Sequence, residues 1–297
     1  MADAADSELP NAWRKCHGWD GESVKALANR VLQYEPPYGV KRARILLTGT
    51  VGSGKSSFFN GVKSVFRNRI ATQAMTGASA RSLTTKFRTY EIRATDGTPL
   101  KFQLCDTPGL EDGQGLEPVD FQFLLDGNVP DGFQCHPNTR ITTNIPGFVK
   151  TPNISNSIHC LAFVIDAATV SVISETIKKK LVDIKDLALS KNIPCLILLT
   201  KVDKVSQIAD VDLSKVYLSK ALQDKVKQVA DLLGLPESQV LLVKNYCKEV
   251  ELDASVDVLT LTAIQRMLGC ADDYFDELAS QQCSDNFENV QLGLQAI

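Results

Sequence analysis

The nine residues GTVGSGKSS at positions 49–57 decide how the rest of this 297-residue chain is interpreted. Their glycines, serines and single lysine are too small or too polar to build a packed core. The first eight match the spacing G-x-x-x-x-G-K-[ST] of a phosphate-binding loop. An apolar run at 45–47 precedes the loop, and Phe58, Val62 and Phe66 follow it on one helical face. The loop is therefore predicted to join a buried strand to a helix.

Such a loop binds phosphate with its backbone. Glycines let the chain curl until consecutive N–H groups point at one anion, and the start of the following helix adds the positive end of its dipole. We expect Lys55 to reach the β- and γ-phosphates and the Ser56 hydroxyl to hold Mg²⁺. The nucleotide contacts expected from this stretch are Gly49, Val51, Gly52, Ser53, Gly54, Lys55, Ser56 and Ser57.

A second motif, DTPG at 106–109, follows the strand predicted over 100–105. In open α/β sheets, ligands bind outside the carboxyl ends of the strands, so this position suits a nucleotide contact. Asp106 is predicted to bind Mg²⁺ through water, and the Gly109 N–H to contact the γ-phosphate.

A third motif, TKVD at 200–203, follows the apolar run 196–199. We expect the Asp203 carboxylate to accept two hydrogen bonds from the N1–H and exocyclic amine of guanine, and the Lys201 stem to lie against the base, with Thr200 beside them. Adenine offers a lone pair in place of N1–H, which costs about 1–3 kcal/mol, and more if a buried charge is left unpaired. GTP or GDP with Mg²⁺ is therefore the expected ligand; an ATPase interpretation depends on the phosphate loop alone.

Two further contacts are less well defined by the sequence. Asn245, within KNY at 244–246, is the first choice for a loop that closes over guanine, with a structural turn as the alternative. A hydroxyl residue before the second strand should contact Mg²⁺ and the γ-phosphate. The candidates are Thr76, Ser82, Thr84 and Thr85, of which Thr84 or Thr85 fits best, and Thr84 is taken as the metal ligand.

The apolar pattern alternates between strands and helices, which predicts a doubly wound α/β fold. Helices are expected on both faces of a mostly parallel sheet. One antiparallel edge strand is expected because Asp96-Gly97 separates the second and third strands. Strands are predicted at 45–48, 84–93, 100–105, 160–166, 195–200 and 240–243, and helices near 23–32, 58–66, 119–125, 177–187, 222–233 and 258–268. Gly234 is the expected cap of the fifth of these helices.

Three segments are predicted: an N-terminal extension at 1–39, partly disordered with a short helix; a GTP-binding domain at 40–280; and a tail at 281–297. The domain carries an insertion at about 111–157. The first ten or so residues are expected to be disordered, and Lys178-Lys179-Lys180 is interpreted as a solvated helix face.

The formal net charge of −3 gives no reason to expect nucleic-acid binding. No signal peptide, lipidation motif or membrane-spanning run is recognised, so the expected location is the cytoplasm, without a membrane anchor. The expected partners are a guanine nucleotide and unidentified proteins, and the sequence leaves open whether two such domains associate.

The three motifs together are similar to those of the Ras-like GTPase superfamily, and this resemblance implies a P-loop NTPase fold of the Ras-like G-domain type. Longer strings, including "GTVGSGKSSFFN", "LCDTPGLED", "IHCLAFVIDA" and "DVLTLTAIQRMLGCADDYFDEL", resemble the interferon-induced protein 44 and 44-like family from about Trp13 to Leu278. That resemblance implies a cytoplasmic GTP-binding protein with a role in interferon-induced antiviral immunity. Larger members carry a TLD-type domain before the GTPase-like part, and the 48 residues ahead of the phosphate loop are not expected to form one.

At the hydrolysis step the chain departs from the Ras-like pattern. In Ras-like enzymes a glutamine after the D-x-x-G glycine orients the attacking water, whereas this chain has Leu110. Gln114 in the same loop, or Arg81 three residues before Thr84, are the candidates for replacing it, each with a solvated loop side chain as the alternative. We therefore expect a nucleotide-dependent switch with slow or partner-stimulated hydrolysis. The alternative is a non-catalytic interaction protein that binds GTP constitutively or not at all.

Overall fold

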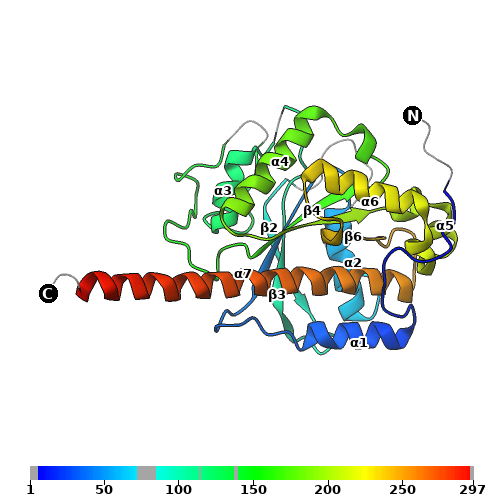
Figure 1. Cartoon of the computed structure of the whole chain (residues 1–297), viewed down its shortest axis with the longest axis horizontal. Helices are drawn as coiled ribbons and strands as arrows, with labels where there is room; N and C mark the ends of the chain where they lie inside the picture. The colour runs from blue at the N-terminus through cyan, green and yellow to red at the C-terminus, as the bar shows by residue number, and fades with distance from the viewer. Residues whose placement is uncertain (1–5, 72–84, 114, 137–139, 295–297) are drawn as a thin grey trace.

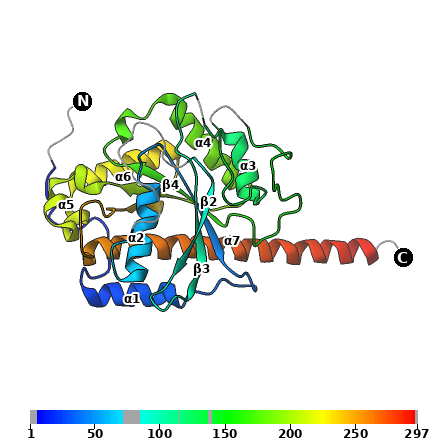
Figure 2. The same cartoon turned by 180° about the vertical axis from the view of Figure 1, so that it is seen from behind.

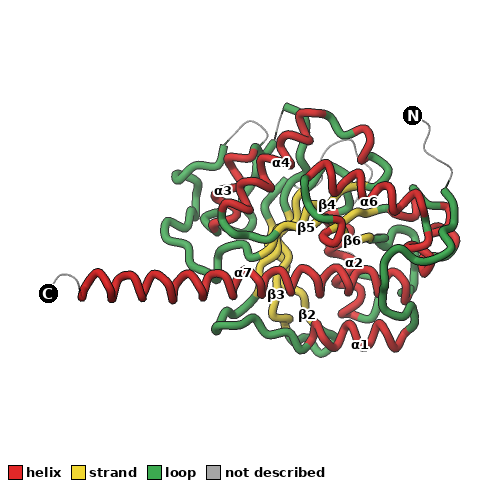
Figure 3. Tube along the Cα trace, viewed as in Figure 1, coloured by secondary structure: helices red, strands yellow, loops and turns green. Residues whose placement is uncertain are grey.

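The computed structural model describes residues 6–71, 85–113, 115–136 and 140–294. Six strands form one sheet in the order β2-β3-β1-β4-β5-β6, and Figure 3 shows this sheet between helices. The strands are β1 (Ala43–Thr48), β2 (Arg88–Arg93), β3 (Pro99–Asp106), β4 (Cys160–Asp166), β5 (Cys195–Thr200) and β6 (Val240–Leu242). Only β2 and β3 pair antiparallel within this sheet. The predicted mostly parallel α/β fold with an antiparallel edge strand is confirmed.

Helices cover both faces of the sheet (Figures 1 and 2). One face packs against α1 (Gly21–Leu32), α2 (Lys55–Arg67) and α7 (Ala254–Leu294); the other against α3 (Pro118–Asp126), α4 (Glu175–Ser190) and α6 (Lys220–Leu233). The short helix α5 (Gln207–Val211) and the 3₁₀ turns η1 (Val170–Val172), η2 (Val202–Lys204), η3 (Leu213–Leu218) and η4 (Glu237–Gln239) lie in the connections.

The central strands β4 and β5 are buried along their whole length, which explains why their sequences are continuous apolar runs. Helices α4 and α6, which follow β4 and β5 along the chain, have capping residues at their ends. Ser174 accepts a hydrogen bond from the Ile177 N–H at the start of α4, and Gly234 takes a left-handed conformation, φ 63°, after α6. The prediction of Gly234 as a cap is confirmed.

A buried histidine fastens the end of the insertion to β1. The backbone N–H of Arg44 donates to Nδ1 of His159, and Nε2 lies 2.7 Å from the Ile154 carbonyl. Because an N–H can only donate, Nδ1 must be the acceptor, and the ring hydrogen is therefore on Nε2. Burial lowers the pKa of His159 to about 4, so this imidazole is neutral at physiological pH.

Three local predictions differ from the structure. The strand expected over 84–93 begins at Arg88; before it, Lys86 bridges to Gln134 of the insertion, and the Phe87 N–H donates to Phe133. The insertion thus pairs with the chain leading into the edge strand, where unpaired backbone groups are a liability.

The other two differences concern the ends of the chain. Helix α7 continues to Leu294, and its last turns extend past the rest of the molecule in both views (Figures 1 and 2). At the other end, Asp6 to Pro10 were expected to be disordered, but this segment pairs with η3 and α6 instead. The limits of the extension, domain, insertion and tail stay predictions.

Among the described helices, none combines the length and the apolar character that a membrane crossing requires.

Candidate functional site

The loops that follow β1, β3, β5 and β6 meet at one edge of the sheet. The Leu110 N–H donates to the Gly49 carbonyl at 2.9 Å, and the Thr200 hydroxyl donates to the Ser53 carbonyl at 2.6 Å. From the loop after β6, the Asn245 amide donates to the Gly54 carbonyl at 3.2 Å. The sequence motifs that were predicted to act together therefore touch one another through the loop at 49–54.

Two glycines show why this loop tolerates no larger residue. A Cβ on Gly49 would lie 2.0 Å from the Val164 carbonyl oxygen, and Gly54 has φ 100° immediately before α2. The N-cap residue of helix α2 is Gly54, which has no side chain to cap the first turn. The first N–H groups of an α-helix have no partner within the helix and form a natural anion site. Val51, Gly52 and Ser53 form the turn before α2, and Ser56 and Ser57 lie in its first turn.

Lys55 is buried inside the loop, with 6% of its surface exposed. Its ammonium donates to the Gly49 and Thr50 carbonyls, each at 3.0 Å. Burial lowers the pKa of Lys55 to about 8, while the Asp106 carboxylate acts in the opposite direction. The cation is thus held against neutral carbonyls, an arrangement that an anionic ligand would improve.

Asp106 faces the start of α2 and has no solvent exposure. Its Oδ2 accepts from the Ser56 hydroxyl at 2.8 Å. Burial raises its pKa to about 6, against the opposing effects of Lys55 and Ser56.

Polar atoms without partners gather around the same loop. Within the described part of the chain, Asp106 Oδ1, Ser53 Oγ and Thr48 Oγ1 are buried and have no hydrogen-bond partner. Buried polar groups in native proteins are nearly always paired, so the lack of a partner for these three atoms requires an explanation. A carboxylate and a hydroxyl are oxygen ligands of the kind Mg²⁺ prefers when phosphates supply the rest. Ser56 and Asp106 therefore fit a magnesium ion bound together with a phosphate ligand.

The third motif forms a tight turn after β5. Thr200 is buried, Lys201 has φ 57°, and Val202 packs in the core at the start of η2. The Lys201 ammonium pairs with Asp166 at 2.7 Å, and the side chain of Asp203 lies 3.1 Å from Lys204 and is 11% exposed. The turn thus holds the Asp203 carboxylate near the surface on a rigid support.

The Asn245 side chain is buried against the phosphate loop. It is 7% exposed, its amide donates to the Gly54 carbonyl, and a Cβ on Gly54 would lie 2.7 Å from that amide nitrogen. The side chain therefore supports the phosphate loop in this structure. A contact between Asn245 and a base stays a prediction.

Several predicted residues lie outside the described part of the chain: Thr76, Arg81, Ser82, Thr84 and Gln114. Their roles stay predictions. Thr85 is described, and its carbonyl accepts from the Cys135 N–H at 2.9 Å and from the Gln134 amide at 3.0 Å. Its backbone is therefore joined to the insertion.

The chain after Gly109 is tied down by residues that the sequence did not single out. Lys180 donates to the Glu111 carbonyl at 2.9 Å and pairs with Glu117 at 2.8 Å. It is buried, so the interpretation of Lys178-Lys179-Lys180 as a solvated face is wrong for its third member. Its position on the buried face of α4, one turn after Ile177, is the only signal in the sequence.

Two more contacts anchor the same loop. The Ser174 hydroxyl donates to Asp112 at 2.7 Å, and Arg140 donates to the Gly115 carbonyl at 3.2 Å. Arg140 also pairs with the buried Asp120 of α3. The loop after DTPG is thus joined to α4 and, through Arg140, to the later part of the insertion.

Leu110 takes the position expected of a water-orienting glutamine. Its side chain is 2% exposed and belongs to the hydrophobic core. A side chain at this position therefore points into the core in this structure.

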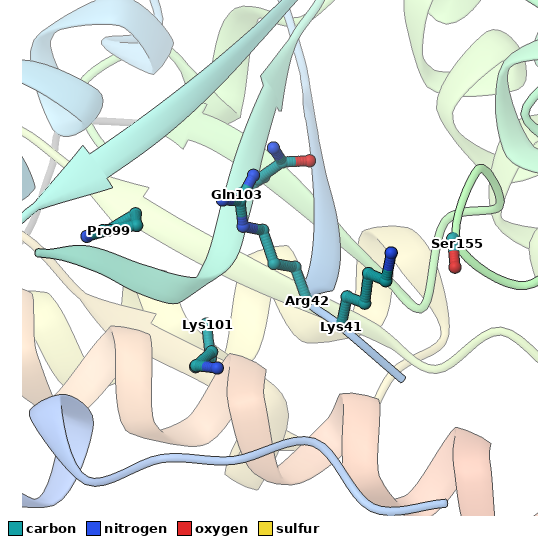
Figure 4. A pocket seen from close by; sticks show the side chains of 6 residues that line it. All are labelled: Lys41, Arg42, Pro99, Lys101, Gln103 and Ser155. Atoms are coloured by element: carbon teal, nitrogen blue, oxygen red, sulfur yellow. The ribbon is translucent and has the colours of Figure 1, made fainter. Parts of the chain in front are cut away.

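A separate pocket of about 430 Å³ lies at the other end of β1 and β3 (Figure 4). Arg42 is paired with Glu91 at 2.8 Å, and Lys101 lies 3.6 Å from Glu35. In Figure 4 the charged ends of Lys41, Arg42 and Lys101 point in different directions. These cations do not converge on one anion, and the pocket is not part of the site described above.

Comparisons with known proteins agree with this geometry. The family model described as "50S ribosome-binding GTPase" matches residues 44–201. Interferon-induced protein 44 of Homo sapiens is 37% identical over 273 residues, covering 91% of this chain and 61% of that protein. Interferon-induced protein 44-like of Homo sapiens is 37% identical over 251 residues, covering 83% and 56%. The predicted family resemblance is confirmed, and the chain spans about three fifths of the length of these relatives.

Among solved structures, Toc33 from Arabidopsis thaliana in complex with GDP and Mg²⁺ is 14% identical, with a TM-score of 0.47. The match covers 84% of this chain and 93% of that one.

Proposed function

The chain belongs to the GTPase family whose model matches residues 44–201, and from this premise we propose that it is a guanine-nucleotide-dependent switch. The observation that carries the proposal is the buried pair Lys55 and Asp106 beneath the start of α2. Among the described residues, the lysine donates its hydrogen bonds to neutral carbonyls, and one carboxylate oxygen of Asp106 has no hydrogen-bond partner. A magnesium–phosphate ligand supplies what both groups lack.

In this proposal the residues at 49–57 hold the phosphates, and Ser56 and Asp106 hold Mg²⁺, with Thr84 as a further predicted ligand. When bound, the metal neutralises charge on the phosphates. Lys55 exchanges its carbonyl contacts for phosphate oxygens. Its ammonium is protonated at neutral pH, because its pKa is about 8.

Asp203 selects the base. Its carboxylate lies at the end of a turn anchored by the buried Val202, and guanine presents two donors to such an acceptor pair. Lys201 is free to lie along the base only if it leaves Asp166, a rearrangement of one surface side chain. Asn245 contributes by supporting Gly54.

Hydrolysis is proposed to be slow without a partner. The buried Leu110 side chain offers no hydrogen bond to a water molecule. Arg81 and Gln114 are the residues proposed to assist, either directly or in a complex. Arginine groups of this kind contribute about 10³–10⁵ in rate where they act.

The switch itself is proposed to be the loop after Gly109. Contact between the Gly109 N–H and a γ-phosphate would change the position of a loop that Lys180 and Arg140 join to α4 and the insertion. The surface formed by those elements is then the part that differs between nucleotide states. Because two relatives carry the words "interferon-induced" in their names, we place this switch in the interferon-linked antiviral response.

The experiment uses the full chain. Protein purified without added nucleotide is denatured and the released small molecules are identified; the refolded or nucleotide-stripped protein is then titrated with GTP, GDP, ATP and ADP in the presence of Mg²⁺. Guanine nucleotides in the released fraction, and a preference for them in the titration, support the proposal. Equal affinity for adenine nucleotides, or no binding at all, contradicts it and favours a nucleotide-independent interaction protein.

Turnover measured over a range of protein concentrations separates two forms of the switch. Specific activity that rises with concentration indicates stimulation by a second copy. A low and constant value indicates that any stimulation comes from another protein.

A further inference from the structure

The N-terminal segment at 6–14 lies along the elements that follow the TKVD motif. The Leu9 N–H donates to the Leu218 carbonyl at 2.8 Å, and the Lys220 N–H donates to the Ser7 carbonyl at 3.0 Å. Trp13 packs edge-on against Tyr217, with ring centroids 5.2 Å apart. In Figures 1 and 2 this dark blue segment runs beside α5.

Asp6 makes the most concentrated set of contacts in this segment. Oδ2 accepts from the Ser206 hydroxyl at 2.5 Å and from the Ile208 N–H at 3.3 Å. Oδ1 accepts from the Ser219 hydroxyl at 2.6 Å and from the Ala221 N–H at 3.3 Å. Burial alone would raise the pKa of Asp6, but these hydrogen bonds hold it below its ordinary value. The ionised carboxylate is therefore the form that the fold selects.

The two serines are the N-caps of successive helices. Ser206 accepts from the Ala209 N–H to begin α5, and Ser219 accepts from the Leu222 N–H to begin α6. Both serines are buried. One carboxylate from the N-terminal segment thus joins the starts of two helices, and fixes how they lie relative to each other.

Ser206 is also the last residue of the turn that carries Asp203. Its N–H donates to the Val202 carbonyl at 3.1 Å, and the Val205 N–H donates to the same oxygen at 3.3 Å. Val202 is fully buried, so the turn is held in the core at one end and by Asp6 at the other. Asp203 lies between these two anchors.

We propose that Asp6 is a positioning residue for guanine selection, acting through Ser206 on the turn that carries Asp203. This inference depends on the proposed function, because it assigns to Asp203 the recognition of the base. Asp6 itself touches no ligand. Without its carboxylate, the Ser206 hydroxyl loses its acceptor, and the Ser206 end of the turn keeps its contacts with Val202 and Ala209.

The test compares GDP with inosine 5′-diphosphate, which lacks the exocyclic amine but keeps the phosphates and the N1–H. The dissociation constant for inosine diphosphate divided by that for GDP reports base selection, and effects on the phosphate loop cancel in this ratio. Asp6→Ala is expected to reduce the preference for GDP by about 3- to 10-fold, as is usual for a residue that acts through another residue and does not touch the ligand. A purely structural role lowers the melting temperature and leaves the ratio unchanged.

Glu8→Ala is the matched control. Glu8 lies in the same segment but is half-exposed and pairs with Lys215, which is also half-exposed, at 3.1 Å. Its removal is expected to leave the ratio unchanged. Asp6→Asn, which keeps one acceptor oxygen, and Ser206→Ala provide the same measurement if Asp6→Ala does not fold, and both are expected to lower the ratio.

The outcomes separate this inference from the function on which it depends. A wild-type protein that binds no GDP, or does not prefer it to inosine diphosphate, contradicts the proposed base recognition. A wild-type protein that prefers GDP, with an unchanged ratio in the Asp6 and Ser206 variants, overturns the positioning role alone. A fall in the ratio for Glu8→Ala that equals the fall for Asp6→Ala also overturns the positioning role.

Discussion

Replacing Leu110 by glutamine would restore the residue type that orients water in Ras-like GTPases, yet we expect Leu110→Gln to leave GTP hydrolysis unchanged. In this structure the residue 110 side chain is 2% exposed and packs in the core. Its backbone is fixed on both sides, since its N–H donates to Gly49 and its carbonyl accepts from Val51. A glutamine at this position would place its amide in the core, away from an attacking water.

The cost of this substitution follows from the burial of Leu110. A fully buried leucine contributes about 1.5–3 kcal/mol through the apolar surface it removes from water. An amide buried without a partner costs about 1–3 kcal/mol. Because the two methylenes of glutamine keep part of the apolar burial, we expect the free energy of unfolding to fall by about 2–4 kcal/mol.

The assay combines urea unfolding with single-turnover GTP hydrolysis. Trp13 and Trp19, the only two tryptophans, report unfolding by fluorescence. Leu110→Met is the control, because a swap of similar volume costs less than about 1.5 kcal/mol. Leu110→Gln protein that hydrolyses GTP at least ten times faster than wild type, with stability within about 1 kcal/mol of it, would refute the reasoning.

Three further predictions concern other buried groups. Lys55→Met is expected to lower GDP affinity about 100-fold, because it removes the buried ammonium of the proposed phosphate site. Calorimetry with Mg²⁺ present measures the affinity, and an unaltered affinity would contradict the assignment. Gly109→Ala places a Cβ 2.7 Å from the backbone nitrogen of Val51 and should weaken Mg²⁺–GTP binding at least about tenfold. An unaltered affinity would show that GTP binding does not need the proposed contact between the Gly109 N–H and the γ-phosphate. The folded-state pKa of His159, about 4, lies below its unfolded value of about 6.5, so the unfolded chain binds more protons and stability falls as the pH drops from 6.5 toward 4. Relative to His159→Gln, in which the buried carboxyls of raised pKa are unchanged, the free energy of unfolding of wild type should fall by about 2 kcal/mol between pH 7.5 and pH 5. A difference between the two proteins that does not change with pH would disprove a neutral buried imidazole.

Much of the sheet could be predicted because its pattern is local. Residues 160–166 and 195–200 are continuous apolar runs, as parallel strands buried on both faces must be. Alternation over Leu100, Phe102 and Leu104 indicated a strand with one buried face, and those residues are buried. The meeting of the three motifs also followed from topology, because the carboxyl ends of parallel strands share one edge.

The remaining features depend on contacts between distant parts of the chain. Nothing near Asp6 indicates that its carboxylate will bridge Ser206 and Ser219, some two hundred residues away. Lys180 could be recognised as buried only once α4 was packed beside the loop that carries Glu111 and Glu117. A lysine in a run of lysines is usually solvated, and here the tertiary structure overrides that expectation.

The extent of α7 could not be read from the chain either. The apolar stripe of Val258, Leu261, Ile264 and Leu268 predicted this helix only near 258–268, and the sequence becomes mainly polar after residue 278. The backbone nevertheless continues as a helix to Leu294.

The phosphate loop and the Asp203 turn are proposed to form one guanine-nucleotide site. Calorimetric titration of GDP and ADP into the wild-type protein and Asp203→Ala, with Mg²⁺ present, measures whether they do. We expect wild type to bind GDP about 100-fold more tightly than ADP, and Asp203→Ala to lose most of this preference while keeping its affinity for ADP. Equal affinities for GDP and ADP in the wild-type protein would contradict this proposal.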